Sequence, residues 1–283
     1  MTPYAWLQLL VFAAVLTGLA IPLGRYVATV HSGRARHSLR LLRAVERLFC
    51  RAAGVGREEM DWKTYGACLL AFNAVSVLFM YALQRLQGLL PMNAAGLPGV
   101  GPDVALNTAV SFATNTNWQA YGGEITMSAF TQMLGLTVQN FLSAATGIAV
   151  SLALIRGFAH SRAEGIGNFW VDLVRATLYL LLPLSLLVAV LLVAQGVPQT
   201  REPEAIAILR EPQIAADGSV VREQRIALGL VASQVAVKQL GTNGGGFYNV
   251  NSAHPLENPT PAAGAIELLA ILLLPAALCF ALG

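Results

Sequence analysis

Hydrophobic residues occur along this chain in long uninterrupted runs that are separated by short polar segments. Five runs are long enough to cross a membrane, because about 20 apolar residues span the hydrocarbon core. Hydrophobic residues make up 55% of the chain and charged residues only 12%, against about 25% charged residues in soluble domains. The pattern predicts an all-α, multi-pass membrane protein with these spans: Tyr4–Gly24, Thr64–Gln84, Ile125–Ile155, Ala176–Thr200 and Ala262–Gly283.

Two further apolar runs, Val104–Ala113 and Ile226–Val237, are too short to cross the membrane alone. Each lies between two predicted spans and is followed by a polar loop. We expect each run to form a half-helix that enters the membrane and returns as an extended loop, since irregular backbone at that depth must be buried in protein or line a wet cavity. Asp103 precedes the first run, as an N-cap or as an acid in the first turn.

The order of span, short run, polar loop and span occurs twice in the same orientation. It predicts two copies of one unit, related by an axis along the membrane normal, after an N-terminal helix and a basic loop. The predicted divisions are 1–61 for the helix and loop, 62–157 for the first unit and 158–283 for the second unit.

The two loops share a Thr-Asn core. Either Thr116-Asn117 or Thr114-Asn115 can be aligned with Thr242-Asn243, and the sequence leaves both alignments open.

Both polar loops carry oxygen atoms suited to a dehydrated monovalent cation. Potassium filters replace the hydration shell of the ion with rings of backbone carbonyls, and glycine allows a close approach of the backbone. Neither loop contains a carboxylate, which a site for a divalent ion would normally carry. The predicted ion-binding residues are Thr114, Asn115, Thr116, Asn117, Thr242, Asn243, Gly244 and Gly245.

The residues predicted to support the filter or shape its mouth are Trp118, Gln119, Gly241, Gly246 and Lys238. Lys238 lies near the end of the second short run. We favour its pairing with the helix dipole or its snorkelling to the interface over its tuning of the field in the pore. Ordinary structural turns in a non-conducting protein are the alternative for both loops. Neither a catalytic triad nor a phosphate loop is present, so we predict no catalytic site and no organic cofactor.

Basic residues cluster between the first two predicted spans and predict the orientation of the chain. Lys and Arg mark cytoplasmic loops, so the N-terminus should lie outside. Arg156 and Arg162 after the third span agree with this orientation. A basic run is usually a solvated surface, and we predict no nucleic-acid partner. The cluster consists of Arg34, Arg36, Arg40, Arg43, Arg47, Arg51, Arg57 and Lys63.

Four segments, Ser111–Gln119, Lys238–Phe247, Asn251–Pro255 and Glu257–Thr260, resemble the potassium-binding A subunit family of bacterial Kdp potassium-transporting ATPases. The resemblance covers the whole chain. It implies the potassium-transporter superfamily fold, with an extra N-terminal helix and four span–pore-helix–span repeats, of which this chain has two. It also implies that the loops form the first two filter strands and that Gln119 affects K⁺ affinity.

The resemblance further implies a function, partners and a location. The chain would capture external K⁺ for an ATP-driven, high-affinity importer in the bacterial inner membrane and pass the ion through a tunnel to the ATPase subunit. The implied partners are membrane lipid, the P-type ATPase catalytic subunit (KdpB), which uses the ATP, KdpC and the small KdpF. A stand-alone transporter driven by the membrane potential is the alternative, and the long Gly-Gly-Gly-Phe motif favours the importer.

Members of this family are about twice as long as this chain and carry four filter strands. No hydrophilic tail follows the last apolar run, which ends at Gly283. We therefore expect either a truncated product or a second polypeptide that supplies the other strands. Two strands alone should not hold K⁺ selectively.

Overall fold

Five long apolar helices dominate the computed structural model, which describes all residues except 1, 33–39, 57, 160–164, 249–250 and 282–283. The five helices that are long and apolar enough to cross a membrane, among the described residues, are Pro3–His31, Trp62–Leu89, Thr131–Ala159, Phe169–Ala194 and Pro261–Ala281. Each overlaps a predicted span, so the chain is a helical multi-pass membrane protein. Four residues used to predict its orientation, Arg34, Arg36, Arg57 and Arg162, lie outside the described residues.

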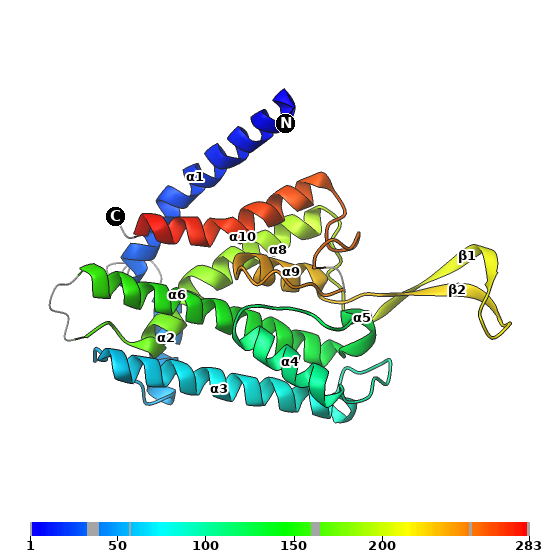
Figure 1. Cartoon of the computed structure of the whole chain (residues 1–283), viewed down its shortest axis with the longest axis horizontal. Coiled ribbons are helices and arrows are strands. Elements are labelled where there is room, and N and C mark those ends of the chain that lie inside the picture. The colour runs from blue at the N-terminus through cyan, green and yellow to red at the C-terminus, as the bar shows by residue number, and fades with distance from the viewer. Residues whose placement is uncertain (1, 33–39, 57, 160–164, 249–250, 282–283) are drawn as a thin grey trace.

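The helices and strands follow one another along the chain as shown in Figure 1. Their bounds are α1 Pro3–His31, α2 Arg40–Ala52, α3 Trp62–Leu86, η2 Gln87–Leu89, α4 Pro102–Ala113, α5 Gly123–Thr126, η3 Thr131–Thr137, α6 Val138–Ala159, α7 Phe169–Arg175, η4 Ala176–Leu181, α8 Leu182–Ala194, β1 Glu204–Ile214, β2 Val220–Ala227, α9 Val231–Leu240 and α10 Pro261–Ala281.

The short helices α4 and α9 lie inside the bundle and correspond to the two short apolar runs. Helix α4 packs against α3 and α6, and α9 packs against α8 and α10. Asp103 lies in the first turn of α4, after Gly101 at the N-cap and Pro102 at the first helical position. Helix α9 begins at Val231, five residues later than the predicted run, because Ile226 still belongs to a strand.

A two-stranded antiparallel sheet, β1 with β2, corrects the prediction of a purely all-α fold. In Figure 1 this hairpin extends away from the helices. The continuous apolar run 205–209 in β1 and the Asp217-Gly218 turn are ordinary hairpin signals. Gly218 has φ 82°, and Asp217 Oδ1 accepts hydrogen bonds from the Ser219 backbone and hydroxyl.

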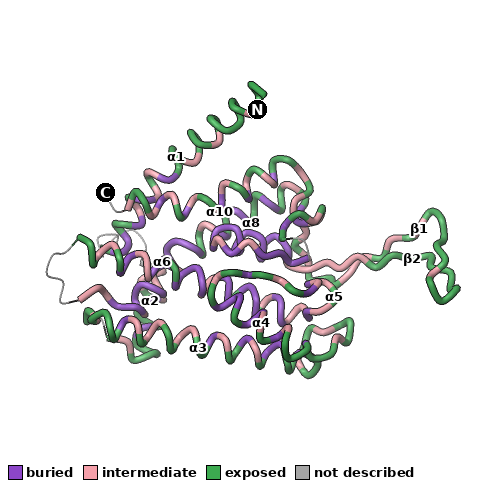
Figure 2. Tube along the Cα trace, viewed as in Figure 1, coloured by how far each residue is buried: buried purple, intermediate pink, exposed green. Residues whose placement is uncertain are grey.

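Polar side chains are buried along one face of α6, in the centre of the bundle. Gln139, Asn140, Ser143 and Thr146 are all buried there, at a spacing that places them on the same side of a helix. Figure 2 shows buried residues concentrated in the central helices, while the hairpin and the N-terminal half of α1 are exposed. Polar groups inside a span face other protein segments or water rather than lipid, so this face marks where a polar site is built.

Candidate functional site

The two polar loops that follow α4 and α9 lie side by side within the bundle. Asn115 Nδ2 donates to the Gly241 carbonyl oxygen at 3.1 Å. A Cβ atom placed on Gly245 would lie 3.3 Å from Asn117 Cβ. The fold therefore brings together the two segments that the sequence singled out, although they are far apart in the chain.

The backbones of the two loops follow the same hydrogen-bonding pattern. In each loop, three successive N–H groups donate in turn to the carbonyls four, three and five residues earlier, at the end of the preceding helix. This pattern aligns Thr116 with Asn243, a spacing of 127 residues that also separates Gln119 from its partner Gly246. The two alignments left open by the sequence correspond to spacings of 126 and 128 residues. Each is therefore wrong by one residue, in opposite directions. The matched donors are Thr114, Asn115 and Thr116 in the first loop and Gly241, Thr242 and Asn243 in the second; in the first loop the Asn117 N–H also donates to the Ser111 carbonyl, at 3.1 Å.

Positive φ angles recur at alternate positions in both loops. They are 65° at Asn115 and 50° at Asn117, and 59° at Thr242 and 77° at Gly244. Asparagine and glycine tolerate this region, but a β-branched threonine there is an outlier. Such strained backbone persists only where its surroundings hold it, and it is concentrated at functional sites.

The carbonyl oxygens of the loops are the groups that this backbone leaves free. In a planar trans peptide the C=O points opposite to the following N–H, and these N–H groups point back to the ends of α4 and α9. The oxygens of Thr114, Asn115 and Thr242 therefore point away from the helices. Over the described part of the chain, no donor pairs with a carbonyl of 114–117 or 242–244. An unpaired peptide oxygen needs water or a cation as its partner.

Neutral side chains hold the first loop and connect it to the second. Asn115 Oδ1 accepts hydrogen bonds from Ser143 Oγ at 2.8 Å and from Asn243 Nδ2. Asn243 Nδ2 also donates to Ser143 Oγ at 3.2 Å. Asn117 Nδ2 donates to Asn140 Oδ1 at 2.5 Å. The polar face of α6 thus braces the loops through amides and hydroxyls.

Gln119 joins the two loops at their C-terminal ends. Its Nε2 donates to the Gly246 carbonyl at 2.8 Å, and its Oε1 accepts from the Gly246 N–H at 2.8 Å. Trp118, predicted to support the mouth, has a side chain that is largely exposed.

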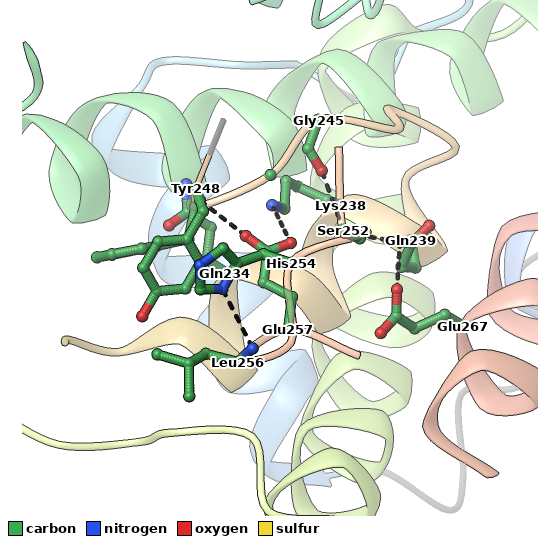
Figure 3. Close-up of polar contacts among 12 residues, drawn as sticks. Gln234, Lys238, Gln239, Gly245, Tyr248, Ser252, His254, Leu256, Glu257 and Glu267 are labelled. Carbon is green, nitrogen blue, oxygen red and sulfur yellow. Dashed lines mark hydrogen bonds and ion pairs between the residues drawn. The ribbon is translucent and has the colours of Figure 1, made fainter. Parts of the chain in front are cut away.

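Lys238 is buried behind the second loop, near the end of α9 (Figure 3). Its Nζ lies 3.7 Å from Glu257 Oε2, and both side chains have 0% exposure. The side chain therefore does not snorkel to an interface, which corrects one of the interpretations favoured from the sequence. Glu257 Oε1 accepts the Tyr248 N–H at 2.8 Å. A Cβ on Gly246 would lie 3.1 Å and 3.2 Å from the two Glu257 oxygens.

Gly241 also has a steric requirement for glycine. A Cβ at this position would lie 2.2 Å from Asn243 Oδ1, so a larger residue would displace the bracing amide. A cavity of about 510 Å³ adjoins Asn115, Gly241 and Thr242 and extends between α6 and α10. No group of three or more His, Cys, Asp or Glu side chains that could hold a metal ion occurs in the part of the chain that the structure describes.

Four supporting residues were not predicted as part of the site: Asn140, Ser143, Glu257 and Glu267. Three of them carried a signal, because a polar or ionisable residue inside an apolar span is a functional candidate by default. Glu257 lies in a polar connection, where nothing in the sequence marks it as the partner of Lys238.

Together these features define a class of protein, a multi-pass membrane protein in which two adjacent polar loops with unpaired peptide carbonyls lie among the helices. The sequence profile described as "Potassium-transporting ATPase A subunit" matches residues 10–283, and the chain belongs to this family.

Proteins similar to this one match it along nearly its whole length. A protein from Sorangium cellulosum named "Potassium-transporting ATPase potassium-binding subunit" is 58% identical over 100% of this chain and 49% of its own length. Relatives with the same name are 55% identical in Herpetosiphon aurantiacus and 52% identical in Clostridium perfringens, over 98% and 99% of this chain. The chain spans about half the length of these relatives, 48% in both latter cases.

Proposed function

We propose that this chain binds K⁺ at the two loops and is the potassium-capturing subunit of an ATP-driven importer of the Kdp type. The observation that supports it most is the row of unpaired loop carbonyls, held in place by N–H bonds to the ends of α4 and α9. Backbone oxygens of this kind replace the water lost by a dehydrated potassium ion.

The chemistry of the loops favours a monovalent ion. Their oxygens come from peptide, amide and hydroxyl groups, and no carboxylate belongs to 114–117 or 241–246. Ca²⁺ and Mg²⁺ sites rely on carboxylates, often with bound water. The ends of α4 and α9 both meet the loops, and a helix C-terminus carries a partial negative charge that favours a cation nearby.

In this proposal the two units are span–pore-helix–span repeats, with α4 and α9 as pore helices. The matched backbone pattern at a spacing of 127 residues supports a common origin for the loops. Potassium filters pool carbonyls from several loops around an axis, so other segments of polypeptide would complete the ring.

The relatives are named as subunits of a potassium-transporting ATPase. We therefore propose that a P-type ATPase catalytic subunit (KdpB) hydrolyses ATP and that KdpC and KdpF complete the complex in the bacterial inner membrane. This chain would itself be non-catalytic, with its N-terminus outside.

A substitution at Gly244 tests the proposal. Gly244 has φ 77° and open space in the direction of a Cβ, so Gly244→Asp would add strain and a charged side chain beside the loop. We expect K⁺ binding by the assembled transporter to weaken by about 100-fold or more.

The matched control is Gly218→Asp at the tip of the hairpin, where φ is 82° and the Cβ direction is also open. It should bind K⁺ like the wild type. The two variants and the wild type are compared in the purified complex. K⁺ binding and K⁺-stimulated ATP hydrolysis are each measured as a function of K⁺ concentration. Equal K⁺ affinity of the wild type and Gly244→Asp would refute the assignment of the loops.

A further inference from the structure

The second loop has buried charged groups behind it, whereas the first loop has neutral ones. At the spacing that aligns the two backbones, Lys238 corresponds to Ser111. The carbonyls of both residues accept N–H groups from their own loops, so their backbone roles match. Only their side chains differ, and the ammonium of Lys238 must be neutralised by a group that the first unit does not use.

Glu257 supplies that group and also contacts the loop. One carboxylate oxygen faces Lys238 Nζ at 3.7 Å, and the other accepts the Tyr248 N–H at 2.8 Å. The carboxylate also occupies the space where Gly246 would carry a side chain. Its own backbone is fixed by a hydrogen bond from the Glu257 N–H to the His254 carbonyl at 2.8 Å.

A second connection reaches the same loop from α10. Glu267 Oε2 accepts Gln239 Nε2 at 2.8 Å, and Gln239 Nε2 also donates to Ser252 Oγ at 3.1 Å. Ser252 Oγ in turn lies 3.5 Å from the Gly245 carbonyl oxygen, to which it can donate. Figure 3 shows both connections converging behind the loop. Gly245 and Gly246 are thus held through charged groups that are themselves buried.

A buried ion pair is not evidence of added stability, because desolvation offsets much of its attraction. Removing one partner, however, leaves an uncompensated charge in the interior. The pair therefore adds little to the free energy of folding but costs much to break. An interaction with these two properties fixes one local geometry. Here that geometry is the outer part of the second loop.

We propose that Lys238 and Glu257 are positioning residues that set the ion affinity of the second loop. Lys238 holds the Glu257 carboxylate, and the carboxylate fixes the Tyr248 N–H and excludes water behind Gly246. The carbonyls of the loop then keep a single spacing. This inference rests on the proposed K⁺-binding function.

The test is a double-mutant cycle in the assembled transporter. Lys238→Met and Glu257→Gln each leave one charge unpaired, and each should weaken K⁺ binding by about tenfold or more. The double variant should bind K⁺ more tightly than either single variant, because it buries no unpaired charge. Glu204→Gln is the matched control, since it breaks the exposed Arg225–Glu204 pair in the hairpin and should leave K⁺ affinity unchanged.

The ratio of Rb⁺ to K⁺ affinity separates positioning from folding. A shift in loop spacing changes this ratio in both single variants, whereas a loss of folded protein lowers the number of binding sites and leaves the ratio unchanged. An unchanged ratio, or additive losses in the double variant, would overturn the inference. If Lys238→Met does not assemble, Glu257→Gln decides, because it preserves side-chain volume and an acceptor for Tyr248. Failure of all three variants to assemble would assign the pair to folding and also overturn it.

Gly244→Asp is measured in the same assay to keep the two proposals apart. Equal K⁺ binding by the wild type and Gly244→Asp would remove the proposed function itself. A defect in Gly244→Asp together with normal K⁺ affinity and a normal Rb⁺ to K⁺ ratio in the Lys238 and Glu257 variants would remove only this inference.

Discussion

The two polar loops share one backbone but differ in what holds it. Both send three matched N–H groups back to the end of the preceding helix and place positive φ angles at alternate residues. The first loop is braced by Asn140 and Ser143 of α6, which are neutral. The second is backed by the buried Lys238–Glu257 pair. The end of the helix thus sets the path of each loop, while its side-chain support is free to differ.

The largest effect on the neutral support is expected from Asn115→Gly. Glycine tolerates the φ of 65° at this position, so the change isolates the side chain, which bonds Gly241, Ser143 and Asn243. Leaving such buried partners unpaired costs about 2 kcal/mol, or about 30-fold in K⁺ affinity.

This prediction is checked by K⁺ titration of the assembled transporter. Asn73→Ala is the control, because the hydrogen bond that the Asn73 side chain makes among the described residues goes to the Leu69 carbonyl of its own helix. Unchanged K⁺ affinity in Asn115→Gly would show that the first loop does not need its neutral brace.

A smaller effect is expected from Gln119→Ala, at the rim where the C-terminal ends of the two loops meet. This change removes both bonds to Gly246, but Gln119 is partly exposed and water can replace its amide. We expect about fivefold weaker K⁺ binding, which corresponds to about 1 kcal/mol.

Gln199→Ala is a matched control for the rim, since Gln199 makes a similar reciprocal contact with Ser233 at the start of α9. K⁺ affinities of the two variants are compared in the same titration. An equal loss in both would mean that the rim contact acts only through the general stability of the second unit.

The smallest effect is expected from Ser143→Ala. Asn115 and Asn243 remain bonded to each other when the hydroxyl is lost, so K⁺ binding should weaken by only about threefold. Ser185→Ala, whose hydroxyl bonds within α8, should have no effect on K⁺ binding. A loss larger than that of Asn115→Gly would reverse the order of importance within the brace.

The spans and the two loops could be predicted from the sequence because their signals are local. Runs such as Thr64–Gln84 are recognised as spans by their length. The two loops between spans are recognised by their content of Thr, Asn and Gly. The alignment of the loops could not be obtained in this way. It depends on where α4 and α9 end and on which carbonyl each N–H reaches, and Thr-Asn pairs fit more than one alignment.

The support of the site depended on contacts that are distant in sequence. Asn140 is 23 residues from Asn117, and Ser143 is 100 residues from Asn243. Lys238 looked like a helix-end charge until its partner in a later connection was known. The hairpin was not predicted, although the apolar run 205–209 and the Asp217-Gly218 pair are hairpin signals.

The contact between Gln119 and Gly246 makes the two loops one mechanical unit. The side-chain amide presents its C=O to the N–H of Gly246 and its N–H to the C=O of Gly246, in the way that a residue on a neighbouring strand would. The C-terminal end of one loop cannot move away from the other without breaking the two hydrogen bonds between Gln119 and Gly246, each 2.8 Å long. Under the proposed K⁺-binding function, an ion that is too large would have to displace both loops at once, so rejection by size would be a joint property of two distant stretches of the polypeptide.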